Sequence, residues 1–439
     1  MKRPEQPQPI TLTEAVIPVA SLILLVALSY FLFGDAGAGG PNQVALVVAT
    51  MIAVFIGWRR GHSLESLGEA AKDSVSTGIT AIFILFAVGA LIGTWAMSGT
   101  LVAMVYYGLQ LLSPNYFYVT ACAISAIVAI SIGSSWTVVG TIGIGFMGIA
   151  ANMGLNPAIA AGAIISGAYF GDTCSPLSDS ANLAAAASGV DLYTHLRETL
   201  LTSSVALAIS LVIFFLLGQP GDFDASTKIE GIKESFHISL WLFLPLIVVV
   251  GLAAFKVTPF TSIFLGAIAG GLLAAILEPG RVTAFADPGG ELPRVVALLK
   301  GVWLALASGY KSSSGIASLD MLASRGGMDS MLNTIWLIIT ADQYIAIVLP
   351  GRMFKSAFAR RGLAPAVLSR SVAGTATPTS SLIPWNSCGA YMAATLGVAT
   401  WSYAPWAFFS YVSPLLTVAI AFLGVRMLRA PEGGAARAE

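Results

Sequence analysis

Apolar runs of roughly 15 to 20 residues, separated by short polar stretches, recur along the whole chain. Uninterrupted runs cover residues 15–33, 44–58, 199–217, 238–255 and 259–277. A helix of about 20 apolar residues crosses the hydrocarbon core of a bilayer. The pattern therefore predicts an all-α polytopic membrane protein.

Two longer apolar segments are interrupted near their middle. Residues 158–190 contain the break Gly171–Asp179, and residues 365–398 contain the break Gly374–Asn386. Both breaks combine Pro and Gly with hydroxyl side chains. Such backbone is tolerated at membrane depth only where it lies against protein or a water-filled cavity. We therefore expect two broken helices or re-entrant hairpins.

The remaining apolar runs bring the expected total to about 11–13 spanning segments. They cover residues 76–95, 99–112, 116–132, the Gly-rich stretch 133–148, the amphipathic stretch 292–307, 329–349 and 405–425. Residues 63–73 fit either a short amphipathic helix on the membrane surface or a solvated connector.

The first apolar run follows Lys2 and Arg3, as the core of a signal peptide does, and Ala36-Gly37-Ala38 resembles a cleavage site. However, the run is longer than the roughly 7–15 apolar residues of a signal core. We therefore expect it to remain in the protein as the first spanning helix.

Composition supports a membrane protein and excludes several other classes. Of 439 residues, 56% are hydrophobic and 10% charged, far from the roughly 25% charged residues of a soluble domain. The net charge of zero gives no sign of nucleic-acid binding. The three cysteines fit neither a zinc site nor a disulfide framework. No phosphate-binding loop is present, so an ATP-driven pump is not expected.

Basic residues are unevenly distributed among the predicted loops. The loop at Arg59 and Arg60 is basic, whereas the loop before it carries no Lys or Arg. Because cytoplasmic loops are enriched in Lys and Arg, both termini are expected in the cytoplasm of a bacterium, with the chain in its inner membrane. His195 belongs to a second polar stretch, Asp191–Arg197, which we expect to be a solvated cytoplasmic loop.

The chain resembles itself after a shift of 208 residues, which aligns residues 134–190 with residues 342–398 without gaps. The shift superimposes the two breaks and places Gly154 on Gly362, Pro157 on Pro365, Pro176 on Pro384 and Gly189 on Gly397. The first copy has no Lys or Arg, whereas the second has five. Copies of opposite orientation would produce this asymmetry. Inverted repeats with matching broken helices are typical of secondary transporters.

The breaks also contain the residues with which a membrane protein could bind a cation. Asp172 and Asp179 lie in the first break, and the repeat places them opposite Ser380 and Ser387. A carboxylate at membrane depth needs a partner or a cation. Burial disfavours its charged form, so it can exchange a proton for a metal ion near neutral pH. One carboxylate holding H⁺ and Na⁺ in turn would give antiport.

The candidate ion or substrate ligands therefore share oxygen chemistry, which suits a hard cation such as Na⁺. They are Asp172, Asp179, Ser175, Ser178, Asn182, Ser134, Asp342, Thr377, Thr379, Asn386 and Ser387, with Asp172 and Asp179 as the direct Na⁺ ligands. Helix capping is the alternative for the aspartates, and Asp179 in particular resembles an N-cap. No cofactor is expected.

The expected organisation follows from the repeat. It consists of a cytoplasmic N-terminus (1–14), a first half (15–217, repeat core 133–190), a connecting loop (218–237), a second half (238–425, repeat core 341–398) and a cytoplasmic tail (426–439).

Three motifs resemble the NhaC-type Na⁺/H⁺ antiporters of the ion transporter superfamily. They are Gly167-Ala-Tyr-Phe-Gly-Asp-x-x-Ser-Pro-Leu-Ser-Asp-Ser-x-Asn-Leu183, Ala341-Asp-Gln-Tyr-x-x-Ile-Val-Leu-Pro-Gly-Arg-Met-Phe354 and Leu382-Ile-Pro-Trp-Asn-x-Cys-Gly-Ala-Tyr-Met392. The resemblance spans about residues 12–425. It implies inverted repeats, a scaffold domain, a transport domain and exchange of Na⁺ for H⁺. From similar folds, a homodimer formed through scaffold helices is also an expectation.

The chain departs from that family at two places. Thr173 stands where the family has a basic residue, and Ala373 and Gly374 stand where it has a Glu-Asp pair. The same family includes members resembling malate–lactate exchangers and amino-acid carriers. A Na⁺- or H⁺-coupled carrier of a small organic acid or amino acid therefore stays open as the alternative.

A channel and a membrane enzyme are the other classes. A pore needs no inverted broken helices. An enzyme would need a nucleophile and base or a set of metal ligands, and the three histidines (His62, His195, His237) lie away from the repeat cores. We expect neither class.

Overall fold

The computed structural model describes residues 8, 11–33, 40–218, 229–230, 232, 238–311, 326–331, 343–384 and 386–429. Within these ranges the chain is helical, and its single pair of bridged residues, Leu363 and Arg429, forms no strand. The loop joining the two halves falls largely outside the described residues, as do Asp342, Trp385 and the tail beyond Arg429.

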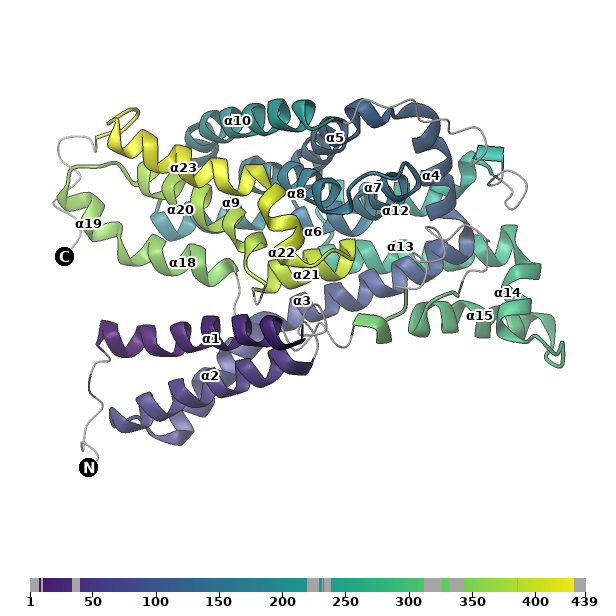
Figure 1. The fold of residues 1–439 in the computed structure, drawn as a ribbon, viewed down its shortest axis with the longest axis horizontal. Coiled ribbons are helices and arrows are strands. Elements are labelled where there is room, and N and C mark those ends of the chain that lie inside the picture. Colours follow the sequence, from purple (N-terminus) through teal and green to yellow (C-terminus); the bar gives the residue numbers. More distant parts are fainter. Residues whose placement is uncertain are drawn as a thin grey trace.

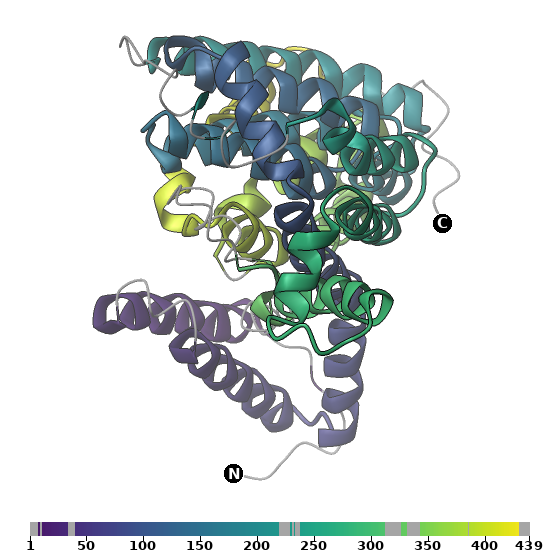
Figure 2. The same cartoon turned by 90° about the vertical axis from the view of Figure 1, so that its right-hand side faces the viewer.

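The N-terminal third is a helical hairpin followed by a long connecting helix (Figures 1 and 2). Its helices are α1 (Leu12–Phe33), α2 (Gly40–Arg59), α3 (Leu64–Ser98), α4 (Thr100–Leu111) and α5 (Phe117–Ile132). Ser63 caps α3 by accepting a hydrogen bond from the Ser66 amide. Residues 64–73 are therefore the first turns of α3, and neither the separate surface helix nor the connector is correct.

The first repeat and the helix after it form the next group. They comprise α6 (Ser135–Val138), a π-helical turn (Val139–Gly143), α7 (Ile144–Asn152), α8 (Pro157–Cys174), α9 (Asp179–Ser188) and α10 (Leu192–Leu216).

The second half begins with four helices: α12 (Leu244–Ala254), α13 (Pro259–Leu277), α14 (Pro279–Ala286) and α15 (Arg294–Ser308). The second repeat and the last helices follow as α18 (Gln343–Met353), α19 (Lys355–Arg360), α20 (Pro365–Thr379), α21 (Ser387–Leu396), α22 (Thr400–Tyr403) and α23 (Phe408–Phe422).

Helix boundaries repeat at the same shift of 208 residues. Helices α9 and α21 match at both ends, and α6 to α7 matches α18 to α19 from Ser135 and Gln343 onward. Gly189 and Gly397 end α9 and α21 in the left-handed conformation that glycine adopts without strain. In Figure 1, α7 lies in the right half and α19 at the left end, so the matched segments extend in opposite directions.

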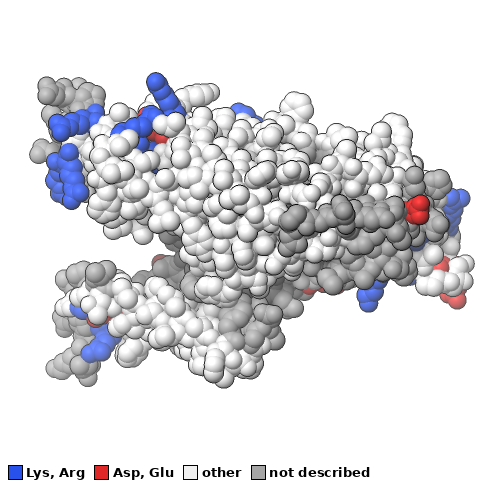
Figure 3. Space-filling view, turned by 45° about the horizontal axis from the view of Figure 1, so that its top comes forward, with Lys and Arg blue, Asp and Glu red and all other residues white. Residues whose placement is uncertain are grey.

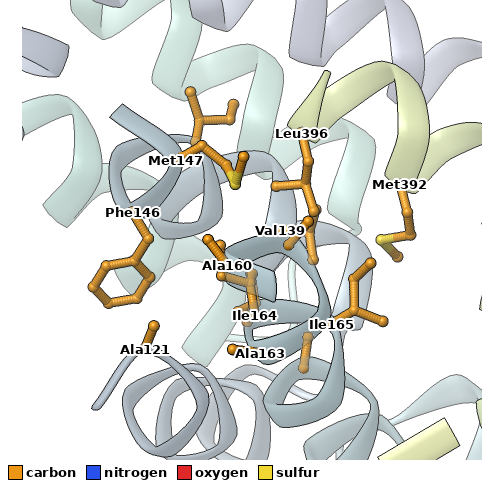
Figure 4. Packing of buried hydrophobic residues seen from close by; sticks show 14 of the residues in the cluster. Ala121, Val139, Phe146, Met147, Ala160, Ala163, Ile164, Ile165, Met392 and Leu396 are labelled. Carbon is orange, nitrogen blue, oxygen red and sulfur yellow. The ribbon is translucent and has the colours of Figure 1, made fainter. Parts of the chain in front are cut away.

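Helix α8 lies in the core of the molecule, and every residue from Ile159 to Cys174 is buried. Figure 4 shows its residues Ala163 and Ile164 among side chains of α5, α7 and α21. Gly171 lies against Ala129 of α5 with no room for a Cβ atom between them. Small residues allow this close helix packing in a bilayer, and it fixes the depth of Asp172, the next residue.

The surface fits a lipid environment. Five described helices are long and apolar enough to cross a membrane, or up to seven if each of two bent pairs is one span. Figure 3 shows a broad face almost free of charge, with Lys and Arg gathered toward the ends. Large apolar side chains such as Leu24, Ile276 and Phe422 are exposed. The chain is thus a multi-pass membrane protein.

The stretch Asp191–Arg197 is not the solvated loop that its polarity predicts. Asp191 caps α10, and His195 is fully buried within that helix. The His195 Nδ1 atom lies 2.7 Å from Ser369 Oγ of α20. The prediction was wrong because a polar residue near a helix start can face a polar partner on a neighbouring helix that local sequence does not reveal.

A buried ion cluster lies next to His195. Glu198 of α10 is 3.6 Å from Arg370 of α20 and 2.7 Å from Arg426, which follows α23. Arg370 is 2% exposed. The cluster joins three elements of both halves at the end of the molecule where α23 ends.

Candidate functional site

The carboxylate of Asp172 lies buried in the last turn of α8 and accepts three hydroxyl hydrogen bonds. Ser135 donates to Oδ2 at 2.7 Å, and Ser178 and Ser180 donate to Oδ1 at 2.7 and 3.1 Å. The donors come from α6, the break and α9. Within the described residues, no Lys, Arg or His forms an ion pair with Asp172. The hydroxyl groups solvate the carboxylate without neutralising it.

Asp179 opens α9 on the other side of the break. Ser178 is the N-cap, because its side chain accepts a hydrogen bond from the Ala181 amide at 3.3 Å. The predicted N-cap at Asp179 is therefore wrong by one residue. Asp179 lies in the first turn, where the helix dipole favours a negative charge, and its side chain is exposed toward two cavities.

The first cavity encloses about 70 Å³ between the two breaks. Both aspartates line it, together with Ser134, Ser135, Trp136, Ser180, Gln343, Tyr344, Ser387, Cys388, Gly133, Ile84 and Pro259. This volume fits an ion with at most a few water molecules. Its walls offer carboxylate, hydroxyl and amide oxygens, the ligands that a hard cation prefers.

A second cavity of about 520 Å³ adjoins the first and shares four lining residues with it: Gly133, Ser134, Asp179 and Pro259. It extends past Asn182, Tyr193 and Lys256, which lie on α9, α10 and the end of α12. Asp179 therefore lies between the small cavity and the larger one.

The two repeats meet at a stacked aromatic pair beside the small cavity. The rings of Trp136 and Tyr391 lie 4.2 Å apart at an angle of 12°. The Tyr391 hydroxyl also donates to the Trp136 carbonyl oxygen at 2.7 Å. Because Trp136 lines the cavity, this contact couples the shape of the cavity to the distance between the repeats.

The other predicted site residues occupy several environments. Ser175 donates to the Ile130 carbonyl oxygen, and Asn182 donates to carbonyl oxygens of the break. Thr379 donates to its own helix at Thr375, and Asn386 caps α21. Among the predicted residues, the structure thus brings Asp172, Asp179, Ser134, Ser178 and Ser387 together at the small cavity.

Thr377 is buried away from the cavity lining. Its hydroxyl has no hydrogen-bond partner within the described part of the chain, and the same holds for Ser387 at the cavity wall. Asp342 lies outside the described residues, so its predicted role as a ligand stays a prediction.

Sequence reasoning missed Ser135, Ser180, Gln343 and Cys388. Each lies next to a residue that was singled out: Ser134, Asp179, Asp342 and Ser387. Each is the first or second residue of a helix, α6, α9, α18 or α21, and lines the small cavity. The first turn of each of these helices was the signal that could have identified them.

The positions that depart from the family motif do not line either cavity. Thr173 donates to the Tyr169 carbonyl oxygen within α8. Ala373 is 1% exposed in an apolar cluster with Ala184 and Ile347. Gly374 packs against α23, where a Cβ atom would come within 2.7 Å of Thr417 Oγ1. The three residues that depart from the family motif therefore contribute to helix packing around the site and not to the lining of either cavity.

The chain resembles known transporters over most of its length. The model of the Na⁺/H⁺ antiporter family matches residues 167–341 and 337–425. An uncharacterized Na⁺/H⁺ antiporter of Haemophilus influenzae is 32% identical, over 90% of this chain and 92% of its own. The Na⁺/H⁺ antiporter NhaC of Alkalihalophilus pseudofirmus is 32% identical, over 87% and 90%. The malate-2H⁺/Na⁺-lactate antiporter of Bacillus subtilis is 31% identical, over 94% and 95%.

Proposed function

The chain belongs to the Na⁺/H⁺ antiporter family, and we propose that it exchanges Na⁺ for H⁺ across a membrane by alternating access. In this proposal Asp172 binds Na⁺ and H⁺ in turn, and Asp179 lies at the entrance to the same site. The chain is a transporter, and no step of the proposal requires an enzymatic reaction.

The observation that carries the proposal is the buried carboxylate of Asp172, which has no ion-pair partner among the described residues and lies beside a cavity of about 70 Å³. A charge at the centre of a bilayer costs at least about 2.5–3.5 kcal/mol. Binding of either a proton or a monovalent cation removes most of that cost. Because both compete for one carboxylate, entry of one requires release of the other.

The inverted repeats supply a mechanism for exposing the site on each side in turn. Broken helices related by an axis in the membrane plane place the ion site near the bilayer midplane, and rocking of one part against the other opens it alternately. The larger cavity, which adjoins the site at Asp179, supports an access route on one side.

That route leads toward the start of α10, the same end of the molecule as the end of α23. Exposed basic residues cluster there, among them Arg360, Arg361 and Arg197. We propose that this end faces the cytoplasm, with the chain in a bacterial inner membrane, because cytoplasmic segments are enriched in Lys and Arg.

Exchange of a small organic acid is the second candidate. The larger cavity of about 520 Å³ would hold such a molecule, and Lys256 on its wall offers a partner for a carboxylate. The relative from Bacillus subtilis is named for malate and lactate. The cavity of about 70 Å³ at Asp172 is too small for malate, and for this reason Na⁺/H⁺ exchange is the first candidate.

The test uses proteoliposomes with an acidic interior and a trapped pH-sensitive dye. External Na⁺ should raise the internal pH, whereas K⁺ and choline should not. Malate outside against lactate inside forms a separate arm of the experiment. A change of internal pH that depends on external malate and internal lactate, with no response to Na⁺ alone, would replace the first candidate by the second.

Two variants test whether the Na⁺-dependent proton flux depends on Asp172. Asp172→Asn should abolish Na⁺-dependent alkalinisation. Asp287→Asn should leave it intact, because Asp287 lines neither of the two cavities at the site and accepts a hydrogen bond from Leu292 N that an Asn oxygen can also accept.

A further inference from the structure

Gln343, the first described residue of α18, forms a second polar link between the two repeats, beside the Tyr391–Trp136 hydrogen bond. Its side chain is buried, and the whole residue is 4% exposed. The amide nitrogen donates to Ser180 Oγ of α9 at 2.7 Å. The amide oxygen accepts from the Cys388 thiol at 2.9 Å and lies 2.9 Å from Ser380 Oγ, whose hydrogen is shared with the Thr377 carbonyl oxygen at 2.6 Å. One side chain therefore binds both breaks.

The direction of these bonds fixes the role of Ser180. An amide NH₂ group can only donate, so the Ser180 oxygen accepts from Gln343. Its own hydrogen is then directed to Asp172 Oδ1 at 3.1 Å. Without Gln343 the Ser180 hydroxyl could rotate away or accept a proton from Asp172 instead. Gln343 thus keeps Ser180 as a donor to the carboxylate.

The repeat accounts for the contact between Gln343 and Ser380. Gln343 matches Ser135, and Ser380 matches Asp172, under the shift of 208 residues. Ser135 bonds to Asp172, and Gln343 bonds to Ser380, so equivalent positions form equivalent contacts. The longer side chain of Gln343 also reaches Ser180 in the other repeat.

We propose that Gln343 is a positioning residue that sets the balance between Na⁺ and H⁺ at Asp172 by holding Ser180 as a hydrogen-bond donor. This inference rests on the proposed function. Hydrogen bonds to the ionised form of a carboxylate favour that form over the protonated one. Loss of one donor therefore favours the proton, and Na⁺ then competes well only at higher pH.

The experiment measures Na⁺-dependent proton flux in proteoliposomes as a function of pH for wild type and Gln343→Met. Methionine has a similar volume but cannot donate. The profile should move to higher pH by about half to one unit, which corresponds to roughly three- to tenfold weaker apparent Na⁺ binding on the acidic side. The maximal rate at alkaline pH should stay within about twofold of wild type.

Thr375→Val is the control, because Thr375 Oγ1 donates only to carbonyl oxygens within α20, and Thr375 neither bonds to Gln343 nor lines either cavity. Its profile should match that of wild type. If Gln343→Met lowers the rate equally at every pH, or changes nothing, the inference is overturned. If wild type itself shows no Na⁺-dependent flux, the proposed function fails instead, so the two failures are distinguishable.

Ser180→Ala tests the same link without altering Gln343, and it serves if Gln343→Met does not fold. It removes the donor directly and should shift the profile in the same direction. The double variant should shift no further than Ser180→Ala alone, because both changes break one chain of bonds. An unshifted Ser180→Ala profile, or additive shifts in the double variant, would overturn the inference.

Discussion

Asp172 of the first repeat and Gln343 of the second are joined through one hydroxyl group. Ser180 Oγ lies 3.1 Å from Asp172 Oδ1 and 2.7 Å from Gln343 Nε2. If the repeats move relative to each other, the distance between Ser180 and Gln343 changes, and the hydrogen bond from Ser180 to Asp172 changes with it. The carboxylate that would bind the ion is therefore directly sensitive to the conformational change that would carry it.

The larger cavity predicts the side from which the site is reached. Tyr193 lies on its wall near the start of α10. A membrane-impermeant thiol reagent should label Tyr193→Cys from the cytoplasmic face, and the three native cysteines should stay unlabelled because they are buried.

Glu291→Cys provides the comparison, because Glu291 is exposed between α14 and α15 at the opposite end of the molecule. It should be labelled from the outer face only. Labelling of both variants from the same face, in vesicles of known orientation, would refute this access route.

The ion cluster at Glu198 predicts that Glu198→Gln is less stable than Arg426→Ala. Glu198→Gln leaves Arg370 and Arg426 close together without a counter-charge and should lower the free energy of unfolding by about 3–5 kcal/mol. Arg426→Ala should cost less, because Glu198 keeps Arg370 as its counter-charge and the lost ion pair is with a side chain that is 34% exposed. Thermal unfolding of purified protein in detergent measures both.

Arg361→Gln is the control for the cluster, since Arg361 is exposed at the end of α19. Its melting temperature should equal that of wild type. Equal melting temperatures for Glu198→Gln and Arg361→Gln would show that the buried cluster contributes nothing to stability.

Because α8 packs closely on α5, adding one methyl group at Gly171 should lower the stability of the protein. Gly171→Ala places a Cβ atom on Ala129, so the helices must separate, at a cost of about 1–3 kcal/mol. Because Asp172 follows directly, apparent Na⁺ affinity should fall as well.

Gly68→Ala is the matched change, since no atom lies within 4 Å of the added Cβ in α3. It should raise stability by about 0.5–1 kcal/mol, because alanine restricts the unfolded chain more than glycine does. If Gly171→Ala were as stable as Gly68→Ala, the helices would not be in the close contact described above.

The repeat and its broken helices could be predicted from the sequence because their signals are local. Pro157 and Pro365 start helices, Gly189 and Gly397 end them, and the breaks carry polar residues within apolar runs. Such signals depend on the backbone of a few neighbouring residues. They therefore survive in a single sequence without any knowledge of tertiary contacts.

Partners across the repeats could not be predicted in the same way. Comparing matched positions pairs Asp172 with Ser380, but it does not reveal that Gln343 contacts Ser180 and Ser380 at once. Likewise, the polar sequence around His195 suggests solvent, and only the packing of α10 on α20 shows that Ser369 is its neighbour. These contacts depend on which helices pack together.

Direct binding of radioactive Na⁺ to purified protein tests the central claim, that one carboxylate at Asp172 binds Na⁺ and H⁺ in competition. For wild type, the dissociation constant for Na⁺ should rise as pH falls, approaching tenfold per pH unit on the acidic side. Asp172→Asn should bind no Na⁺ at any pH while unfolding at a temperature close to that of wild type. Wild-type affinity for Na⁺ in Asp172→Asn, or binding by wild type that does not change with pH, would contradict the account.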